Sequence, residues 1–330
     1  MKFWGAVLSA VVVSVALVSE SAWAIPTLPI LGDAQSYAVL AGTTVTNTGS
    51  SVITGNVGVW AGTATTGFSA SGNTFVGPGT NTDGPGIVNA PSEIHLTDGP
   101  GIGTAENAQS ALTSAITALS GLAGSANDLT GHDLGTSGTS PISSLLPGVY
   151  FFSTTAQLNG TLTLDANGQN GVGWVFLIGT SLTTASASSV QFSDLGSNMG
   201  SDDGVYWVVG SEATLGTTTA FEGNILANTS ITAQTGATDE NGRLLASTGA
   251  VSLDDSTIYN VCPAGVPGNG GPGLSGGLEV SPNGELEVIT EGTGPGPSGV
   301  IPEPCTLLLL GSGLVGLVAS RARRSKRSSR

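Results

Sequence analysis

A short motif, a glycine followed by apolar residues, recurs through the second half of the chain. It begins at Gly204, Gly223 and Gly242, which stand 19 residues apart, and earlier copies begin at Gly148 and Gly173. In the last three copies a second alternating segment follows, and then small polar residues. Short strands with small-residue corners at a period of about 20 residues indicate the coils of a β-solenoid.

A single coil of this kind cannot bury its apolar side alone, so neighbouring coils must cover one another. Stacking is expected to bury one column of apolar residues, formed by Leu215, Ile231, Val251 and Leu253. Residues 34–68 have a similar texture, with short alternating strands separated by Gly, Asn and Ser. These strands are predicted at residues 37–40, 45–47, 52–54 and 57–59.

One segment departs from the strand pattern and predicts a helix over residues 104–122. Its apolar residues recur at helical spacing and form one stripe. Thr104 is the expected N-cap, and Gly121 and Gly124 supply the end. The helix interrupts the coils, so the solenoid is expected to be discontinuous in sequence, with the helix along one side. The stripe consists of Ala105, Ala108, Leu112, Ala115, Ile116, Leu119 and Leu122.

The charges exclude several classes of partner. The formal net charge is −15, and Arg243 is the one Lys or Arg outside the terminal segments. The central body is therefore strongly acidic, which excludes nucleic acid and anionic membranes as partners, because no basic patch can form. A positive mean hydropathy of +0.24 argues against disorder. We expect a soluble monomer.

The N-terminus carries the features of a secretory signal peptide. Lys2 precedes an apolar run over residues 3–18, and Ser-Ala-Trp-Ala at residues 21–24 provides an A-x-A cleavage site. Cleavage after Ala24 removes residues 1–24. The alternative is an uncleaved membrane anchor.

The C-terminus resembles the PEP-CTERM sorting signal. Ile-Pro-Glu-Pro at residues 301–304 precedes an apolar stretch over 305–319 and a basic run over 321–330. The stretch is shorter than the roughly 20 residues of a permanent span. The resemblance implies processing by an exosortase of a Gram-negative bacterium after transient inner-membrane anchoring, and exopolysaccharide as a further possible partner. A plain membrane anchor is the alternative, and both place the domain outside the cytoplasm.

These signals divide the chain into four parts. A Gly- and Pro-rich stalk is expected between the solenoid and the sorting signal, and the segments 277–280 and 285–288 within it predict one β-hairpin. Cys262 has no intramolecular partner once the tail with Cys305 is removed, so no disulfide is expected. The four parts are residues 1–24, 25–260, 261–300 and 301–330.

Several segments together resemble the microbial ice-binding proteins of the DUF3494 type. The first of these segments is Leu-Gly-Asp-Ala-Gln-Ser-Tyr-Ala-Val-Leu-Ala-Gly-Thr-Thr-Val-Thr-Asn-Thr-Gly at residues 31–49. It continues at residues 55–59, 63–68, 146–150, 162–166, 174–176 and 210–258. The resemblance implies a mainly β fold, a discontinuous right-handed parallel β-helix of triangular section with one helix packed alongside. It also implies that one flat face of small residues adsorbs to an ice crystal.

Threonine suits such a face, because its methyl packs while its hydroxyl donates and accepts hydrogen bonds. One residue per coil forms a ladder with a repeat of about 4.8 Å. We expect the site in the small-residue corner segments, two of which, 63–66 and 235–238, have a T-A/G-x-T pattern. The candidates are Thr63, Thr65, Thr66, Thr184, Ser186, Thr217, Thr219, Thr235 and Thr238.

Two observations oppose this hypothesis. Threonines are also ordinary strand residues on solvent-facing surfaces. Asp254 and Asp255 occupy the matching place in the last coil, so that coil either caps the stack or spoils the face. The sequence leaves open which of the three faces binds.

An enzyme is the rival class, because solenoids also carry polysaccharide lyases and hydrolases. The catalytic base of a lyase is usually Lys or Arg, and the body of this chain offers only Arg243. A hydrolase needs two carboxylates placed on either side of the sugar bond that it cleaves. The pairs Asp202–Asp203 and Asp254–Asp255 are expected to be solvated turns, since neighbouring strand side chains point to opposite faces. His95 and His132 are expected in loops outside the coils, so no metal, cofactor or catalytic residue is predicted.

A third possibility is a non-enzymatic matrix or adhesion protein on the same solenoid. The sorting signal favours it, and the corner threonines would then fail to form one flat, uncharged face.

Overall fold

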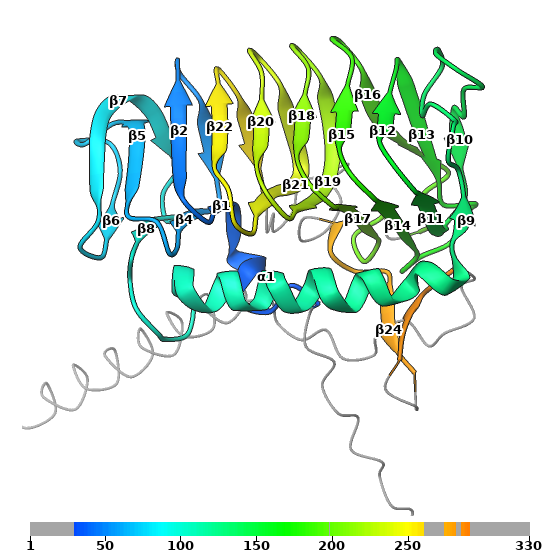
Figure 1. The fold of residues 1–330 in the computed structure, drawn as a ribbon, viewed down its shortest axis with the longest axis horizontal. Helices are drawn as coiled ribbons and strands as arrows, with labels where there is room; N and C mark the ends of the chain where they lie inside the picture. Colours follow the sequence, from blue (N-terminus) through cyan, green and yellow to red (C-terminus); the bar gives the residue numbers. More distant parts are fainter. Residues whose placement is uncertain (1–29, 198, 261–273, 282–284, 291–330) are drawn as a thin grey trace, which may run out of the picture.

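The computed structural model describes residues 30–197, 199–260, 274–281 and 285–290. The predicted signal peptide, Cys262 and the sorting signal lie outside these residues. Within them, short parallel strands stack coil upon coil, and each complete coil contributes one strand to each of three faces. A single long helix runs beside the stack (Figure 1). The predicted mainly β fold with a helix alongside is confirmed.

We name the three stacks face A, face B and face C. In stacking order, face A consists of β9 (Asn127–Asp128), β11 (Gly148–Phe152), β14 (Gly173–Ile178), β17 (Gly204–Val209), the second halves of β19 (Ala220–Ala227) and β21 (Thr238–Ala246), β1 (Tyr37–Ala41), β4 (Asn56–Val59), β8 (Ile94–Leu96) and β6 (Phe75–Val76).

Face B consists of β12 (Ala156–Leu158), β15 (Leu182–Thr184), β18 (Ala213–Leu215), β20 (Ile231–Ala233), β22 (Val251–Asp254), β2 (Thr44–Thr48), β5 (Ala64–Phe68) and the first half of β7 (Thr80–Val88). Face C consists of β10 (Ser144–Leu145), β13 (Thr161–Asp165), β16 (Ser189–Ser193), the first halves of β19 and β21, β23 (Thr257–Tyr259), β3 (Val52–Thr54) and the second half of β7.

The order of coils in space differs from their order in the chain. The N-terminal coil, β1 to β3, stacks on the last coil, in which β21, β22 and β23 pair with β1, β2 and β3. The coil with Asp254 and Asp255 therefore lies inside the stack, and the expectation that it caps the stack is wrong. After β8, the helix carries the chain along the solenoid to β9 at the other end (Figure 1). This is the predicted discontinuity.

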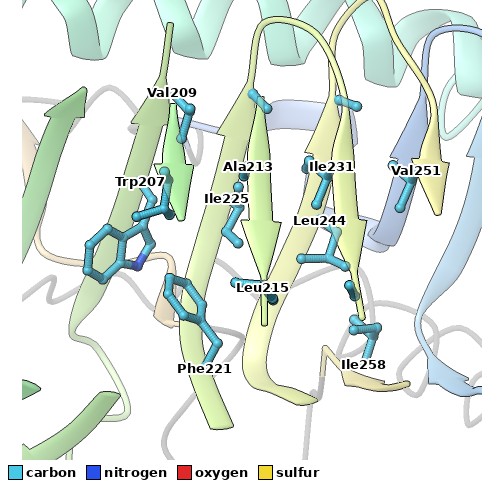
Figure 2. Packing of buried hydrophobic residues seen from close by; sticks show 14 of the residues in the cluster. Trp207, Val209, Ala213, Leu215, Phe221, Ile225, Ile231, Leu244, Val251 and Ile258 are labelled. Carbon is cyan, nitrogen blue, oxygen red and sulfur yellow. The ribbon is translucent and has the colours of Figure 1, made fainter. Parts of the chain in front are cut away.

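Alternating side chains fill the interior of the solenoid. Leu215, Ile231, Val251 and Leu253 are all buried as predicted, although they form two columns, with Ile231 opposite Val251 and Leu253 opposite Ala233. Under face A the rings of Phe176 and Trp207 stack with centroids 3.8 Å apart. Figure 2 shows this packing continuing from Trp207 through the neighbouring coils. Burial of these columns is the main contribution to stability.

The helix α1 (Ala105–Ser120) covers the outer side of face A and continues as the 3₁₀ helix η2 (Gly121–Ser125). Thr104 is the N-cap, as predicted, and its hydroxyl accepts from the backbone N–H of Asn107. Every residue of the predicted apolar stripe is buried. The stripe packs on outward-facing residues of face A and on a second 3₁₀ helix, η1 (Gly32–Ser36).

Part of the predicted stalk is folded onto the solenoid. The expected hairpin is present as β24 (Leu278–Val280) and β25 (Leu286–Val288). Leu274 inserts into the core, and the N–H of Gly173 on β14 donates to the carbonyl of Ile289 at 3.0 Å. The hydroxyl of Tyr206 donates to Ser275 O. Residues 274–281 and 285–290 thus cover face A beside the helix.

We expect Leu274→Ala to lower the free energy of unfolding by about 2–5 kcal/mol, because it removes a buried side chain from the core. Ile102→Ala is the matched control, since Ile102 is 97% exposed. Chemical denaturation measures both. An equal, small effect at the two positions would show that the segment does not contribute to the folded unit.

A buried polar cluster joins the N-terminal segment to the last coils. The guanidinium of Arg243 donates to Gln35 O through Nε at 3.0 Å and Nη2 at 2.8 Å, and to Asn224 Oδ1 through Nη1 at 2.7 Å. Asp239 on β21 points inward between Phe221 and Ile258 and is fully buried. Desolvation, and then the nearby Glu222, hold the pKa of Asp239 well above its ordinary value.

This burial predicts a loss of stability in alkaline solution. Desolvation also raises the pKa of Glu222 from 4.5 to about 8. A carboxyl whose pKa is raised on folding stabilises the fold fully below its unfolded pKa, and this contribution is lost as pH rises through the folded pKa. The midpoint of thermal unfolding should fall between pH 5 and pH 9, and Asp239→Asn should reduce the fall. An identical pH dependence in wild type and variant would contradict this assignment.

Candidate functional site

Face B carries an unbroken row of short polar side chains on its outer side. Its members occupy matching positions in successive strands, so each lies directly beside the next. We call this set the central row. It consists of Gln157, Thr183, Thr214, Thr232, Ser252, Thr46, Thr66 and Thr82.

Strand alternation produces this row. In β18, Ala213 and Leu215 point into the core and Thr214 points out; Thr232 has the same relation to Ile231 and Ala233. Neighbouring strands lie about 4.8 Å apart, so the row extends roughly 34 Å along the solenoid. Its residues are exposed or half-buried. The packed core beneath them and the inter-coil hydrogen bonds hold the hydroxyls in a fixed, regular array.

A second row flanks the central row on its N-terminal side. Backbone hydrogen bonds, such as Leu182 N to Glu212 O at 3.1 Å and Ala213 N to Ser230 O at 3.0 Å, keep its members aligned. Glu212 is the one charged member. The row consists of Thr155, Ser181, Glu212, Ser230, Ala250, Thr44, Ala64 and Thr80.

The other two faces are less suited to a flat contact. Face A is covered by α1 and the hairpin. Face C has a row of small residues in register, including Thr161, Ser189 and Thr238. Beside that row, however, Glu222 and Glu240 lie directly opposite each other. Face B is the one open face whose central row carries no charge.

The predicted corner segments do stack, but they form a convex edge between faces B and C. Ala187 N donates to Thr217 O at 2.9 Å, and Thr218 N donates to Thr235 O at 3.0 Å. Ser186 lies in the same turn as Ala187, and the Thr235 hydroxyl donates to Asp254 Oδ2. Thr63 is exposed just before β5, on the other side of face B.

Three predicted site residues lie in the interior. Thr65, Thr184 and Thr219 are 1%, 3% and 0% exposed, so they are unable to touch a crystal. The hydroxyls of Thr184 and Thr219 are 2.7 Å apart, and Gly216 N donates to Thr184 Oγ1 at 2.8 Å. These two small side chains fill the inner side of the corner. Among the predicted candidates, Thr66 belongs to the central row and Thr238 to face C.

Sequence reasoning missed most of the central row. Its members stand singly between two buried residues, as in Ala-Thr-Leu and Ile-Thr-Ala, whereas the predicted corner segments are runs of small residues rich in threonine. Pairs of apolar residues separated by one Thr or Ser, repeated once per coil, are the signal that marks it.

Two of the titratable groups considered in the sequence analysis lie elsewhere than predicted. His95 lies on β8 rather than in a loop, and its Nδ1 pairs with Asp98 Oδ2 at 2.5 Å at the start of α1. Asp203 is buried rather than solvated. Its Oδ1 accepts from Val172 N at 3.0 Å, and desolvation raises its pKa to about 6. In the described parts of the chain, no group of three or more His, Cys, Asp or Glu is placed to hold a metal. None of the helices described there is long and apolar enough to cross a membrane.

Comparison with known proteins agrees with this geometry. The model of the ice-binding-like family matches residues 39–259, from within β1 to the end of β23. The chain belongs to the ice-binding-like family. A second model, the PEP-CTERM protein-sorting motif, matches residues 300–324.

Relatives within the ice-binding-like family share both sequence and fold. An ice-binding protein of Nostoc sp. (strain HG1) is 38% identical over 301 residues, covering 91% of this chain and 89% of that protein. The solved ice-binding protein of the Antarctic ascomycete Antarctomyces psychrotrophicus has a TM-score of 0.55 at 33% identity, covering 69% of this chain and 96% of that one. An ice-binding protein from an Antarctic biological consortium has a TM-score of 0.53 at 34% identity, over 70% and 90%.

We predict that Thr184→Val and Thr219→Val each lower the free energy of unfolding by about 1–3 kcal/mol, because each leaves a buried polar group without its partner. The double variant should lose less than the sum of the two, since both hydroxyls are then removed. Thr183→Val, in the exposed central row, should change stability by about 0.5 kcal/mol or less. Additive losses in urea unfolding would contradict the pairing.

Proposed function

We propose that this protein adsorbs to ice through face B. The observation that carries the proposal is the central row, in register over successive coils and uncharged, on the face left open by the helix and the hairpin. Family membership and the relatives named ice-binding protein support it. The contact residues we assign are Thr183, Thr214, Thr232, Ser252, Thr46, Thr66 and Thr82.

The physical basis is a preorganised hydration layer. Each threonine presents a methyl and a hydroxyl, and the repeat of about 4.8 Å is imposed by the backbone ladder rather than by flexible side chains. Waters held at such positions lose little further entropy when they join a crystal. The corner candidates Ser186, Thr217 and Thr235 lie at the edge of this surface. They do not form the contact surface themselves, because a convex edge meets a flat crystal only along a line.

We further propose secretion and surface sorting. The sorting motif at residues 300–324 supports processing by an exosortase and localisation outside the cytoplasm of a Gram-negative bacterium, with transient inner-membrane anchoring. The same motif favours a second candidate function, a non-enzymatic matrix or adhesion protein, with exopolysaccharide as its partner. We assign no catalytic activity and no cofactor to either.

Thr232→Tyr tests the assignment of face B. A bulky ring in the middle of the central row should hold the surface away from the crystal, so thermal hysteresis and ice-crystal shaping should be lost. Thr238→Tyr on face C and Thr235→Tyr at the corner are matched controls and should retain activity. Circular dichroism checks that each variant is folded.

Loss of activity in Thr238→Tyr alone would move the site to face C. Absence of crystal shaping and of recrystallisation inhibition in the wild type at micromolar concentration would refute the ice-binding proposal and leave the adhesion function.

A further inference from the structure

Glu212 is the one acidic residue of the row that flanks the central row on the outer side of face B. It is exposed, directly precedes β18, and stands two residues before Thr214 of the central row. In the flanking row its neighbours on the two adjacent coils are Ser181 and Ser230, as the hydrogen bonds Leu182 N to Glu212 O and Ala213 N to Ser230 O show. A long carboxylate therefore interrupts a row of short side chains.

The other acids around face B are tied to protein groups. Asp254 Oδ2 accepts from the Thr235 hydroxyl, Asp255 Oδ1 from Ser50 N at 2.6 Å, and Asp83 Oδ1 from Ala70 N at 2.8 Å. Asp254 faces outward at the end of β22, beside Thr48 of β2, and its carboxylate is held by the Thr235 hydroxyl. No hydrogen bond or ion pair joins the Glu212 side chain to any residue that the structure describes.

Neutralisation by a cation within the fold is also excluded for the described chain. Arg243 is its one Lys or Arg, and that guanidinium is buried against Gln35 and Asn224. No cation and no hydrogen-bond donor among the described residues therefore binds the exposed Glu212 carboxylate. A carboxylate binds water strongly, and it loses part of that hydration when a surface closes over it.

We propose that Glu212 restrains ice adsorption on face B, so that it determines how much of this face contacts the crystal. The inference rests on the proposed function. The carboxylate separates the coils of β12 and β15 from the coils of β20 to β7, and its hydration prevents an ordered water layer from extending across β18. Replacing it with the serine of the adjacent coils would make the flanking row uncharged along its whole length.

The experiment compares Glu212→Ser with wild type in recrystallisation inhibition and thermal hysteresis, using residues 25–300, the chain without its predicted signal peptide and sorting signal. The concentration for half-maximal inhibition should fall about tenfold, since removing a desolvation cost of about 1.4 kcal/mol changes an equilibrium constant tenfold. Glu212→Gln keeps the length of the side chain and removes its charge, so it should show a smaller gain.

Glu240→Ser is the matched control. Glu240 is also an exposed glutamate on a strand, but it belongs to face C, so its replacement removes the same charge without altering face B. Its activity should equal that of the wild type. Unfolding midpoints of all variants establish that the fold is retained.

Two outcomes overturn the proposal while leaving the proposed function in place. The first is unchanged or reduced activity of Glu212→Ser when Thr232→Tyr abolishes activity, because the carboxylate would then be neutral or helpful to binding. The second is an equal gain in Glu240→Ser, which would make net charge the cause. If wild type, Glu212→Ser and Thr232→Tyr all fail to shape ice, the proposed function fails, and this inference fails with it.

Discussion

The pairing of the N-terminal coil with the last coil is the contact on which the rest of the structure depends. β1, β2 and β3 pair with β21, β22 and β23 in parallel register. Ser50 N donates to Asp255 Oδ1 across this seam, although the two residues are 205 positions apart in the chain. Arg243 reinforces the seam from the side of face A by donating to Gln35 O. Without the seam, two half-solenoids would each expose a row of unpaired backbone groups, which is unfavourable for any open strand edge.

The surface assigned to ice depends on that pairing of coils. Ser252, from the C-terminal coils, lies beside Thr46, from the N-terminal coil, so the central row continues through the junction without a break. Neither half of the chain holds enough of the row to present a long regular surface. The buried columns under face B, together with the paired hydroxyls of Thr184 and Thr219 inside the corner, keep the strands from shifting relative to one another. Rigidity of the face follows from packing that is continuous through all coils.

The outer sides of the three faces differ in what covers them and in their charge. Face A is outwardly apolar and is covered by α1, η1 and the docked hairpin, so it supplies a second layer of core. Face C carries the glutamates of β19 and β21, which suit a solvated surface. Face B remains open and nearly uncharged. Its acids include Asp254 on β22, which accepts from the Thr235 hydroxyl, and Glu212 before β18, whose carboxylate no described residue binds. Glu212 is therefore the side chain that matters most for how this surface meets a crystal.

The sequence by itself determined the strands, the helix and the coil period, because these depend on local spacing. Apolar residues two apart gave β18, β20 and β22, and the stripe from Ala105 to Leu122 gave α1 with its cap at Thr104. Local spacing also marked Leu215 and Val251 as core. It misplaced Thr65, Thr184 and Thr219, because a run of threonines at a turn does not show which of them point inward. Which hydroxyls align into one row was decided only by the tertiary structure, since the register between coils is set by backbone hydrogen bonds between strands far apart in the chain.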